Sequence, residues 1–261
     1  MLQSVIKMEM AQEQIKFTKM HGIGNDYIYI DCTKAMPDDP EGLSREMSDR
    51  HFGIGSDGII LILPSDKADF RMRIFNADGS EARMCGNGSR CVGKYVYDHG
   101  LTDKMQLTLE TLAGIKVLDL HLDENGAVGS VTVDMGEPTA DVDMVPVRSG
   151  EKQMIDADVA ISSGKLRITA ISMGNPHGVV FVDDLSEIDI HTVGRELELH
   201  PMWPDRANIE FARILSSDMI QMRVWERGSG ETMACGTGAC ATAVAGVLTG
   251  RCRRDVTIRL L

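Results

Sequence analysis

Two stretches of this chain alternate between apolar and polar residues, which is the pattern of a β-strand with one buried face. Each of them leads into a glycine-rich segment that contains a cysteine. Three further stretches in the first half are separated by Gly and Asn turn signals, and we expect them to be strands as well. The predicted strands are Phe70–Phe75, Met219–Trp225, Gln106–Leu112, Ile115–Leu122 and Gly129–Met135.

A helical pattern follows each glycine-rich segment. The segments read CGNG from Cys85 and CGTG from Cys235, and helices are predicted over Ser89–Tyr97 and Ala239–Leu248, the second rich in alanine. Each half of the chain is therefore expected to contain a strand, a glycine-rich loop, a helix and more strands. This mixture predicts an α/β (α+β) fold.

The chain also resembles itself at an offset of 150 residues. The segments that start at Phe70 and Ile220 share Met, Arg, Glu, Cys and two Gly residues, and Gly24-Asn25 aligns with Gly174-Asn175 without a gap. A repeat of this kind predicts two pseudo-symmetric halves whose equivalent loops face each other across a cleft, and domain interfaces are favoured ligand sites. Leu261 aligns with Thr111, so the second half has no counterpart of residues 112–138. We expect that a C-terminal segment of about this length is missing, unless the second half is by nature shorter than the first.

Composition narrows the choice of partner. The formal net charge is −12, and nucleic-acid binding depends on clustered Lys and Arg, so a small-molecule ligand is expected and nucleic acid is not. Apolar residues make up 43% of the chain, but they form no run of the ~18 residues that a membrane span needs, and the N-terminus lacks the pattern of a secretion signal. The sequence predicts a cytoplasmic protein that does not interact with membranes.

Two of the six cysteines are candidates for acid–base chemistry. Cys85 and Cys235 each precede a predicted helix, whose amides and positive dipole end are expected to lower a thiol pKa. Stereoinversion needs a thiolate that removes a hydrogen on one face of a carbon and a thiol that delivers one on the other. The glycines beside them leave backbone amides free to bind a carboxylate. Cys32, Cys91, Cys240 and Cys252 are interpreted as packing residues.

Two other residues could tune the thiols. His177 lies in the turn GNPHG before an apolar run, and a His beside a thiol can adjust its protonation. Glu226 and Arg227 end the predicted strand that leads to Cys235, where a surface ion pair is the alternative interpretation. Two other functions remain open at this point: an epimerase of the proline racemase type, and a redox or zinc-binding module.

Five segments, in order along the chain, resemble the diaminopimelate epimerase family. They are MHGIGNDY from Met20, FNADGSEARMCGNGSRC from Phe75, GNPHG from Gly174, ANIEF from Ala207 and ERGSGETMACGTGACA from Glu226. The resemblance implies two α/β halves, each with strands wrapped around a central helix. It also implies conversion of LL-diaminopimelate to the meso form without pyridoxal phosphate or metal, in lysine and peptidoglycan precursor synthesis, by a homodimer.

The resemblance also assigns roles to individual residues. It makes Cys85 and Cys235 the proton-transfer pair and His177 and Glu226 the residues that tune their pKa values. The implied substrate-binding residues are Asn25, Ser56, Asn76, Gly86, Asn87, Asn175, Asn208, Glu226, Arg227, Gly236 and Thr237.

The chain departs from the family pattern at three points. Some members have a Gln where this chain has Ser56, so we expect a weaker contact there or one made through water. The family usually starts near residue 17 and continues past the last residue of this chain. The sequence therefore predicts a flexible extension over 1–16, a first half over 17–138 and a second half over 139–261 that is truncated at its C-terminus.

Overall fold

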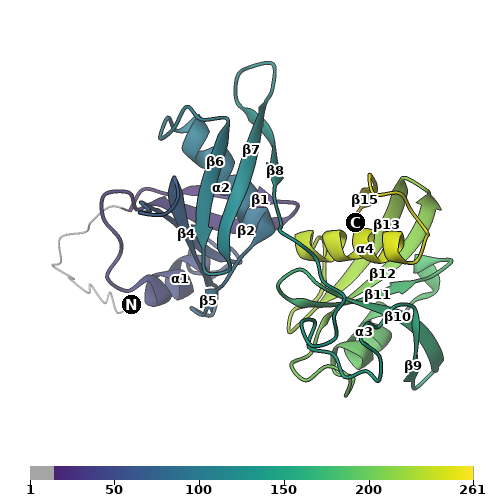
Figure 1. The fold of residues 1–261 in the computed structure, drawn as a ribbon. Coiled ribbons are helices and arrows are strands. Elements are labelled where there is room, and N and C mark those ends of the chain that lie inside the picture. Colours follow the sequence, from purple (N-terminus) through teal and green to yellow (C-terminus); the bar gives the residue numbers. More distant parts are fainter. Residues whose placement is uncertain (1–14, 261) are drawn as a thin grey trace, which may run out of the picture.

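The computed structural model describes residues 15–260, which form two bodies joined by the chain that leaves β8 (Figure 1). Each body contains one mixed sheet that curls around a helix. The predicted extension, apart from residues 15 and 16, lies outside the described residues. The two sheets lie on either side of the predicted boundary at 138/139.

The first sheet wraps around helix α2 (Gly86–Asp98) and carries helix α1 (Pro40–Ser48) on its other face. Side chains alternate along its strands, so Tyr27 and Tyr29 pack toward α2 while Ile28 and Ile30 pack toward α1. In sheet order the strands are β1 (Thr18–Gly22), β2 (Asn25–Asp31), β3 (Gly58–Leu63), β4 (Phe70–Asn76), β6 (Gln106–Thr111), β7 (Gly114–Leu122) and β8 (Val128–Val133), with β5 (Glu81–Ala82) paired to β4.

The second sheet has the same plan. Helix α4 (Gly236–Leu248) packs on one face, and helix α3 (Ile190–Glu198) packs on the other, close to a short 3-10 turn, η1 (Leu185–Glu187). Its strands in order are β14 (Gly230–Thr232), β13 (Met219–Glu226), β12 (Asn208–Ser216), β11 (Pro176–Phe181), β10 (Gly164–Ser172) and β9 (Ala157–Ile161), with β15 (Thr257–Arg259) paired to β13.

The 150-residue repeat holds at the level of strand register. Ile28 pairs with Ile59 in parallel β2 and β3, and their counterparts Gly178 and Ile209 pair in β11 and β12. Helices α1 and α3, and likewise α2 and α4, have the same bounds after the offset. The predicted α/β fold of two pseudo-symmetric halves is therefore confirmed. Within residues 15–260, β7 and β8 have no counterpart in the second sheet.

The five predicted strands are present as β4, β6, β7, β8 and β13, with ends that move by a residue or two. The two predicted helices begin three residues earlier than expected, at Gly86 and Gly236. Glycine is a poor helix former, so the sequence pattern predicted both helix starts too late. Because the helices begin at these glycines, Cys85 and Cys235 are their N-cap residues.

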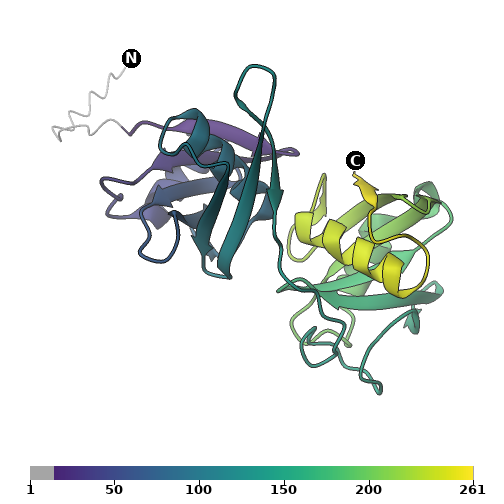
Figure 2. The same ribbon diagram turned by 45° about the horizontal axis from the view of Figure 1, so that its top comes forward.

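The two central helices point their N-terminal ends toward the junction of the bodies, and Figure 2 shows that end of α4 directed at the first sheet. The side-chain oxygen of Asn87 lies 3.9 Å from the position that a Cβ atom on Gly236 would occupy. Each helix start thus approaches its counterpart in the other half. Among the described residues, no helix is long and apolar enough to cross a membrane.

Gly58 sits where β3 meets β4, and a side chain there has no room. A Cβ atom would lie 2.1 Å from the backbone oxygen of Phe75 and 2.9 Å from the ring of Tyr27. We expect Gly58→Ala to cost at least ~2 kcal/mol of unfolding free energy and to lower Tm by roughly 4–8 °C. Thermal unfolding followed by circular dichroism tests this. Gly150→Ala, where no atom lies within 4 Å, is the control and should leave Tm unchanged.

Candidate active site

A cleft of about 1460 Å³ lies between the two bodies and is lined by residues from both. Its walls contain all the sequence-predicted site residues except His177 and Asn208, which lie behind the wall of the second half. The predicted residues that line it are Asn25, Ser56, Asn76, Cys85, Gly86, Asn87, Asn175, Glu226, Arg227, Cys235, Gly236 and Thr237.

Cys85 caps the start of α2. Its sulfur accepts a hydrogen bond from the backbone amide of Gly88 at 3.3 Å, and its thiol donates to the side-chain oxygen of Asn25 at 3.4 Å. Asn25 is held in turn by Asp57, whose carboxylate accepts from the Asn25 amide at 2.8 Å. Because β2 and the α2 start are both fixed by the sheet, the sulfur has a defined direction toward the cleft.

Cys235 caps the start of α4 in the same way. Its sulfur accepts from the amide of Gly238 at 3.4 Å and lies 3.3 Å from the hydroxyl oxygen of Thr237. The residue is buried, and the negative charge of the nearby Glu226 carboxylate acts on it. The two sulfurs therefore have equivalent backbone surroundings but different side-chain partners.

The expected lowering of the thiol pKa values is wrong. Burial raises the pKa of Cys85 to about 11, although the amides of Gly88 and Asn87 act to lower it. Burial also raises the pKa of Cys235, and the negative charges of Glu226 and Glu210 raise it further. The helix-start amides are present as predicted, but removing a thiolate from water outweighs them. Both sulfurs are therefore thiols at neutral pH.

Glu226 ends β13 and faces Cys235. Burial raises the pKa of its carboxyl, while the hydroxyl of Thr232, which donates to it, acts in the opposite direction. A carboxylate with a raised pKa beside a thiol is a stronger base than an exposed one. The next residue, Arg227, lines the cleft, and its backbone amide donates to the side-chain oxygen of Asn208 at 2.9 Å.

His177 is fully buried in the second half of the protein, behind the residues that line the cleft. Its Nδ1 lies 2.7 Å from a carboxylate oxygen of Glu210, and its Nε2 lies 3.0 Å from the side-chain oxygen of Asn175. The Asn175 amide donates to Thr237 at 3.5 Å. His177 thus reaches Cys235 through two intermediate side chains.

The remaining predicted residues differ in how free their polar atoms are. Asn76 donates to the hydroxyl of Ser80, and Asn87 accepts from Arg90 at 2.7 Å. Ser56 is buried, and its hydroxyl lies within hydrogen-bonding distance of the Gly58 carbonyl and of Ser48. The Ser56 hydroxyl is therefore engaged within the first half.

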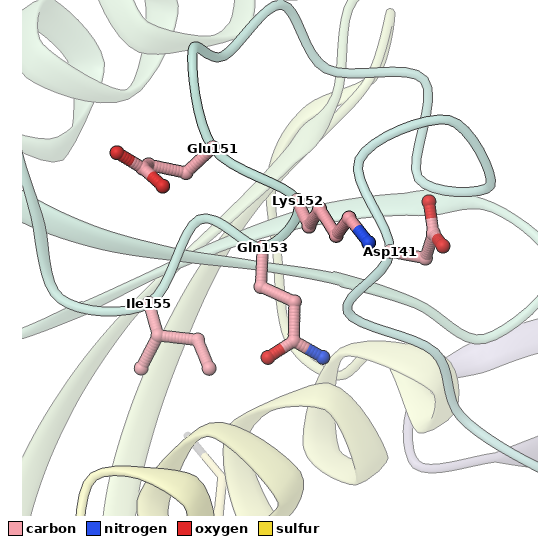
Figure 3. Close-up of a pocket in the computed structure, with 5 residues that line it drawn as sticks. All are labelled: Asp141, Glu151, Lys152, Gln153 and Ile155. Carbon is pink, nitrogen blue, oxygen red and sulfur yellow. The ribbon is translucent and has the colours of Figure 1, made fainter.

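A second hollow, of about 500 Å³, lies among the loops that precede β9 (Figure 3). It is lined by Asp141, Glu151, Lys152, Gln153 and Ile155. These side chains include no thiol, hydroxyl or imidazole that could act as a nucleophile or as an acid–base group near neutral pH. The chemistry that the sequence predicts is concentrated in the large cleft.

Comparison with known proteins places the chain in a family. The family model for diaminopimelate epimerase matches residues 17–140 and 169–261. The chain belongs to the diaminopimelate epimerase family. Relatives named diaminopimelate epimerase include one from Methanococcus maripaludis, 51% identical over 95% of this chain and 89% of its own length, and one from Bacteroides thetaiotaomicron, 57% identical over 94% and 86%.

The fold is shared more widely than the family. The crystal structure of a hydroxyproline epimerase from Agrobacterium vitis, with bound trans-4-hydroxy-L-proline, superimposes with a TM-score of 0.66. It is 20% identical to this chain, and the match covers 92% of this chain and 78% of that one. At this identity the likeness concerns the fold.

Several residues of this family member were missed by sequence reasoning. Glu210 was missed although a charged residue inside the apolar stretch of a central strand is a signal in itself. Tyr27 lines the cleft, and burial followed by the charge of a Cys85 thiolate raises its pKa. Arg50 also lines the cleft and forms ion pairs with Asp26 at 2.7 Å and Asp57 at 2.9 Å. Only the folded chain brings Arg50, Asp26 and Asp57 together.

The raised pKa of Cys85 has a measurable result. We expect the rate of Cys85 carbamidomethylation by iodoacetamide, without substrate, to rise with pH toward a midpoint near 11. At pH 8 the thiol should react roughly tenfold more slowly than an unfolded-chain cysteine, because its smaller thiolate fraction outweighs the higher nucleophilicity of that thiolate. Mass spectrometry of the Cys85 peptide gives the rate. A midpoint at or below 8.5 would contradict the assigned direction.

Proposed function

We propose that this protein is a diaminopimelate epimerase, an isomerase that interconverts LL- and meso-diaminopimelate in lysine and peptidoglycan precursor synthesis without a cofactor. The observation that carries the proposal is the pair of cysteine N-caps, Cys85 and Cys235, which line the same cleft from the starts of two helices. The chain that contains them belongs to this family. An acid and a base on opposite faces of a carbon are what stereoinversion requires.

The proposed reaction begins with the formation of a thiolate. At Cys235 the thiol proton passes to the neighbouring carboxylate of Glu226, whose pKa is raised by burial. The thiolate then removes the hydrogen from the α-carbon of the substrate, and the Cys85 thiol donates its own hydrogen to the opposite face. The proton held by Glu226 returns to the Cys85 thiolate once the product has left, which restores both thiols and the carboxylate. In the reverse direction the two sulfurs exchange roles.

Negative charge develops on the substrate carboxylate as the hydrogen leaves. The amides at the starts of α2 and α4, at Gly86, Asn87, Gly236 and Thr237, are proposed to bind this carboxylate from both sides. These donors are fixed by their helices, so they need no rearrangement when the charge appears. They stabilise the carbanion more than the substrate, which is the condition for a faster reaction.

The distal amino and carboxylate groups of the substrate need polar partners farther along the cleft. We assign this role to Arg227 and to the asparagines 25, 76, 175 and 208, with Ser56 as a weaker contact made directly or through water. Arg227 is anchored because its guanidinium donates to the backbone oxygen of Asp205 at 3.1 Å. A guanidinium is suited to a carboxylate because it offers parallel donors.

The direct test follows isotope incorporation in deuterated water. With LL-diaminopimelate, proton NMR should show loss of the α-hydrogen signal at the inverted carbon together with formation of the meso isomer. L-proline and trans-4-hydroxy-L-proline serve as control substrates and should show no exchange. Turnover of either one, with none of diaminopimelate, would replace this function with one of the proline racemase type.

The cellular setting is part of the same proposal. The family resemblance supports a cytoplasmic homodimer that does not act at membranes, and the net charge of −12 argues against nucleic acid as a partner. Light scattering coupled to size-exclusion chromatography should give twice the mass of 28.6 kDa. A mass equal to that of one chain would remove the dimer from the proposal and leave the chemistry unchanged.

A further inference from the structure

Glu210 is a carboxylate in the interior of the second half, with no exposed surface. One of its oxygens lies 2.7 Å from His177 Nδ1, and the other has no hydrogen-bond partner among residues 15–260. An incompletely paired buried carboxylate is costly to keep, and an apolar residue could fill the same volume. The proton-transfer chemistry described above does not use this group.

Two features of the fold offset part of that cost. A Cβ atom on Gly238 would lie 2.5 Å from the carboxylate oxygen of Glu210, so the carboxylate packs directly against the first turn of α4. The positive end of the helix dipole stabilises a negative charge there. His177 supplies the second source of stabilisation because its Nδ1 lies within hydrogen-bonding distance of the carboxylate.

From Glu210 a continuous series of polar contacts leads to the sulfur of Cys235. The distances are 2.7 Å to His177, 3.0 Å from His177 to Asn175, 3.5 Å from Asn175 to Thr237, and 3.3 Å from Thr237 to the Cys235 sulfur. We call these four contacts the Glu210 chain. Two of the four side chains before the sulfur, Asn175 and Thr237, also line the cleft.

The Glu210 chain has two self-consistent arrangements of its hydrogen bonds. In one, His177 donates to the Asn175 oxygen, the Asn175 amide donates to Thr237, and the Thr237 hydroxyl donates to a thiolate. In the other, the Asn175 amide is turned around, donates to an unprotonated Nε2 and accepts from Thr237, which accepts from a thiol. Whether Thr237 donates a hydrogen bond to the Cys235 sulfur or accepts one from it therefore depends on whether His177 Nε2 carries a hydrogen. Glu210 holds the Nδ1–H of the same ring in place.

The first half lacks this device at the corresponding positions. At the 150-residue offset the counterparts of Glu210 and His177 are Ile60 and Tyr27, and the strand registers agree, since Ile60 pairs with Ile74 as Glu210 pairs with Val224. The Ile60 Cδ1 lies 2.6 Å from the Cβ position of Gly88, where the Glu210 oxygen meets Gly238. A methyl group thus supports the Cys85 helix at the point where a carboxylate supports the Cys235 helix.

We propose that Glu210 is a positioning residue that serves Cys235 and not Cys85, by fixing His177 and, through Asn175 and Thr237, the direction of the hydrogen bond at the Cys235 sulfur. The inference rests on the proposed function for its kinetic consequence. Its structural consequence, a link between the state of Cys235 and the ring of His177, can be measured without turnover.

The kinetic test uses Glu210→Gln, which keeps the size and an oxygen acceptor but removes the charge. We expect kcat to fall at least about tenfold while KM for diaminopimelate stays within about twofold. The matched control is Ile60→Val, at the counterpart position, which should change both constants by less than about twofold. The substrate deuterium isotope effect should become unequal for the two stereoisomers in Glu210→Gln alone, because only one of them is deprotonated by Cys235.

The second test uses nitrogen NMR of labelled histidine in Cys235→Ser and Cys85→Ser. The ring signals of His177 should shift from their wild-type positions in Cys235→Ser and remain there in Cys85→Ser. Equal responses to the two substitutions, or an unchanged kcat in folded Glu210→Gln, would overturn the proposal. Wild-type protein without activity on diaminopimelate would instead remove the proposed function, and the NMR comparison would still decide the role of Glu210.

Discussion

Cys85→Ala and Cys235→Ala are each expected to lose stereoinversion of diaminopimelate by at least about 10⁴-fold in kcat, because each leaves one face of the carbon without a proton donor or acceptor. The effect should be as large for one cysteine as for the other, since every turnover uses both. The buried surroundings of the sulfurs make replacement by water inefficient. KM is expected to change little, because the carboxylate-binding amides come from the backbone and remain.

The measurement is the initial rate of meso-isomer formation from the LL isomer, together with deuterium incorporation from solvent. Cys240→Ala is the matched control: Cys240 lies one turn farther along α4, outside the cleft lining, and its loss should leave kcat within about twofold. Inversion that survives in either active-site variant would end the two-thiol mechanism, whereas exchange without inversion would show that the remaining sulfur still works alone.

Glu226→Gln is expected to lower kcat by about 10²–10⁴-fold. Burial raises the pKa of the Cys235 thiol, so a thiolate forms there only if a neighbouring base takes its proton, and Glu226 is the carboxylate whose charge acts most strongly on this thiol. An amide of the same size cannot accept that proton. The folded structure should be retained because the glutamine fills the same volume.

The pH dependence gives a second readout of the same residue. Since the Glu226 pKa is raised above 4.5, the carboxylate base is lost as the pH falls through that higher value. Wild-type activity should therefore decline on the acid side above the ordinary glutamate range, and this decline should be absent in Glu226→Gln. Glu231→Gln is the control: Glu231 lies on the same hairpin, outside the cleft lining, and its loss should leave the acid decline in place. An unchanged pH profile in Glu226→Gln would contradict the assignment.

Local sequence patterns were sufficient for the repeat and for the strands that alternate, because these depend on period and spacing. They placed the helix starts too late, since the first turns at Gly86 and Gly236 consist of residues that disfavour helices until a cap and an opposing sheet hold them. Helices α1 and α3 were not predicted at all. Their signals were nevertheless present in the capping residues Asp39 and Asp189.

The electrostatics of the site could not be read from the sequence. A helix start lowers a thiol pKa and burial raises it, and which effect is larger depends on side chains far away in the chain that cover the sulfur. Glu210, which acts on Cys235, precedes it by 25 residues and comes from a neighbouring part of the sheet. The family resemblance directed attention to His177, but only the fold brought its carboxylate partner into contact with α4.

The meeting of the two helix starts also bears on the cleft itself. Both α2 and α4 present the positive ends of their dipoles to the same space, near Asn87 and Gly236. Like poles repel, so this arrangement of the two helix starts costs electrostatic energy. A carboxylate held there, as proposed above, is attracted to both poles and acts as a counter-ion for the scaffold. We therefore expect the substrate to stabilise the junction of the two halves as well as to react in it.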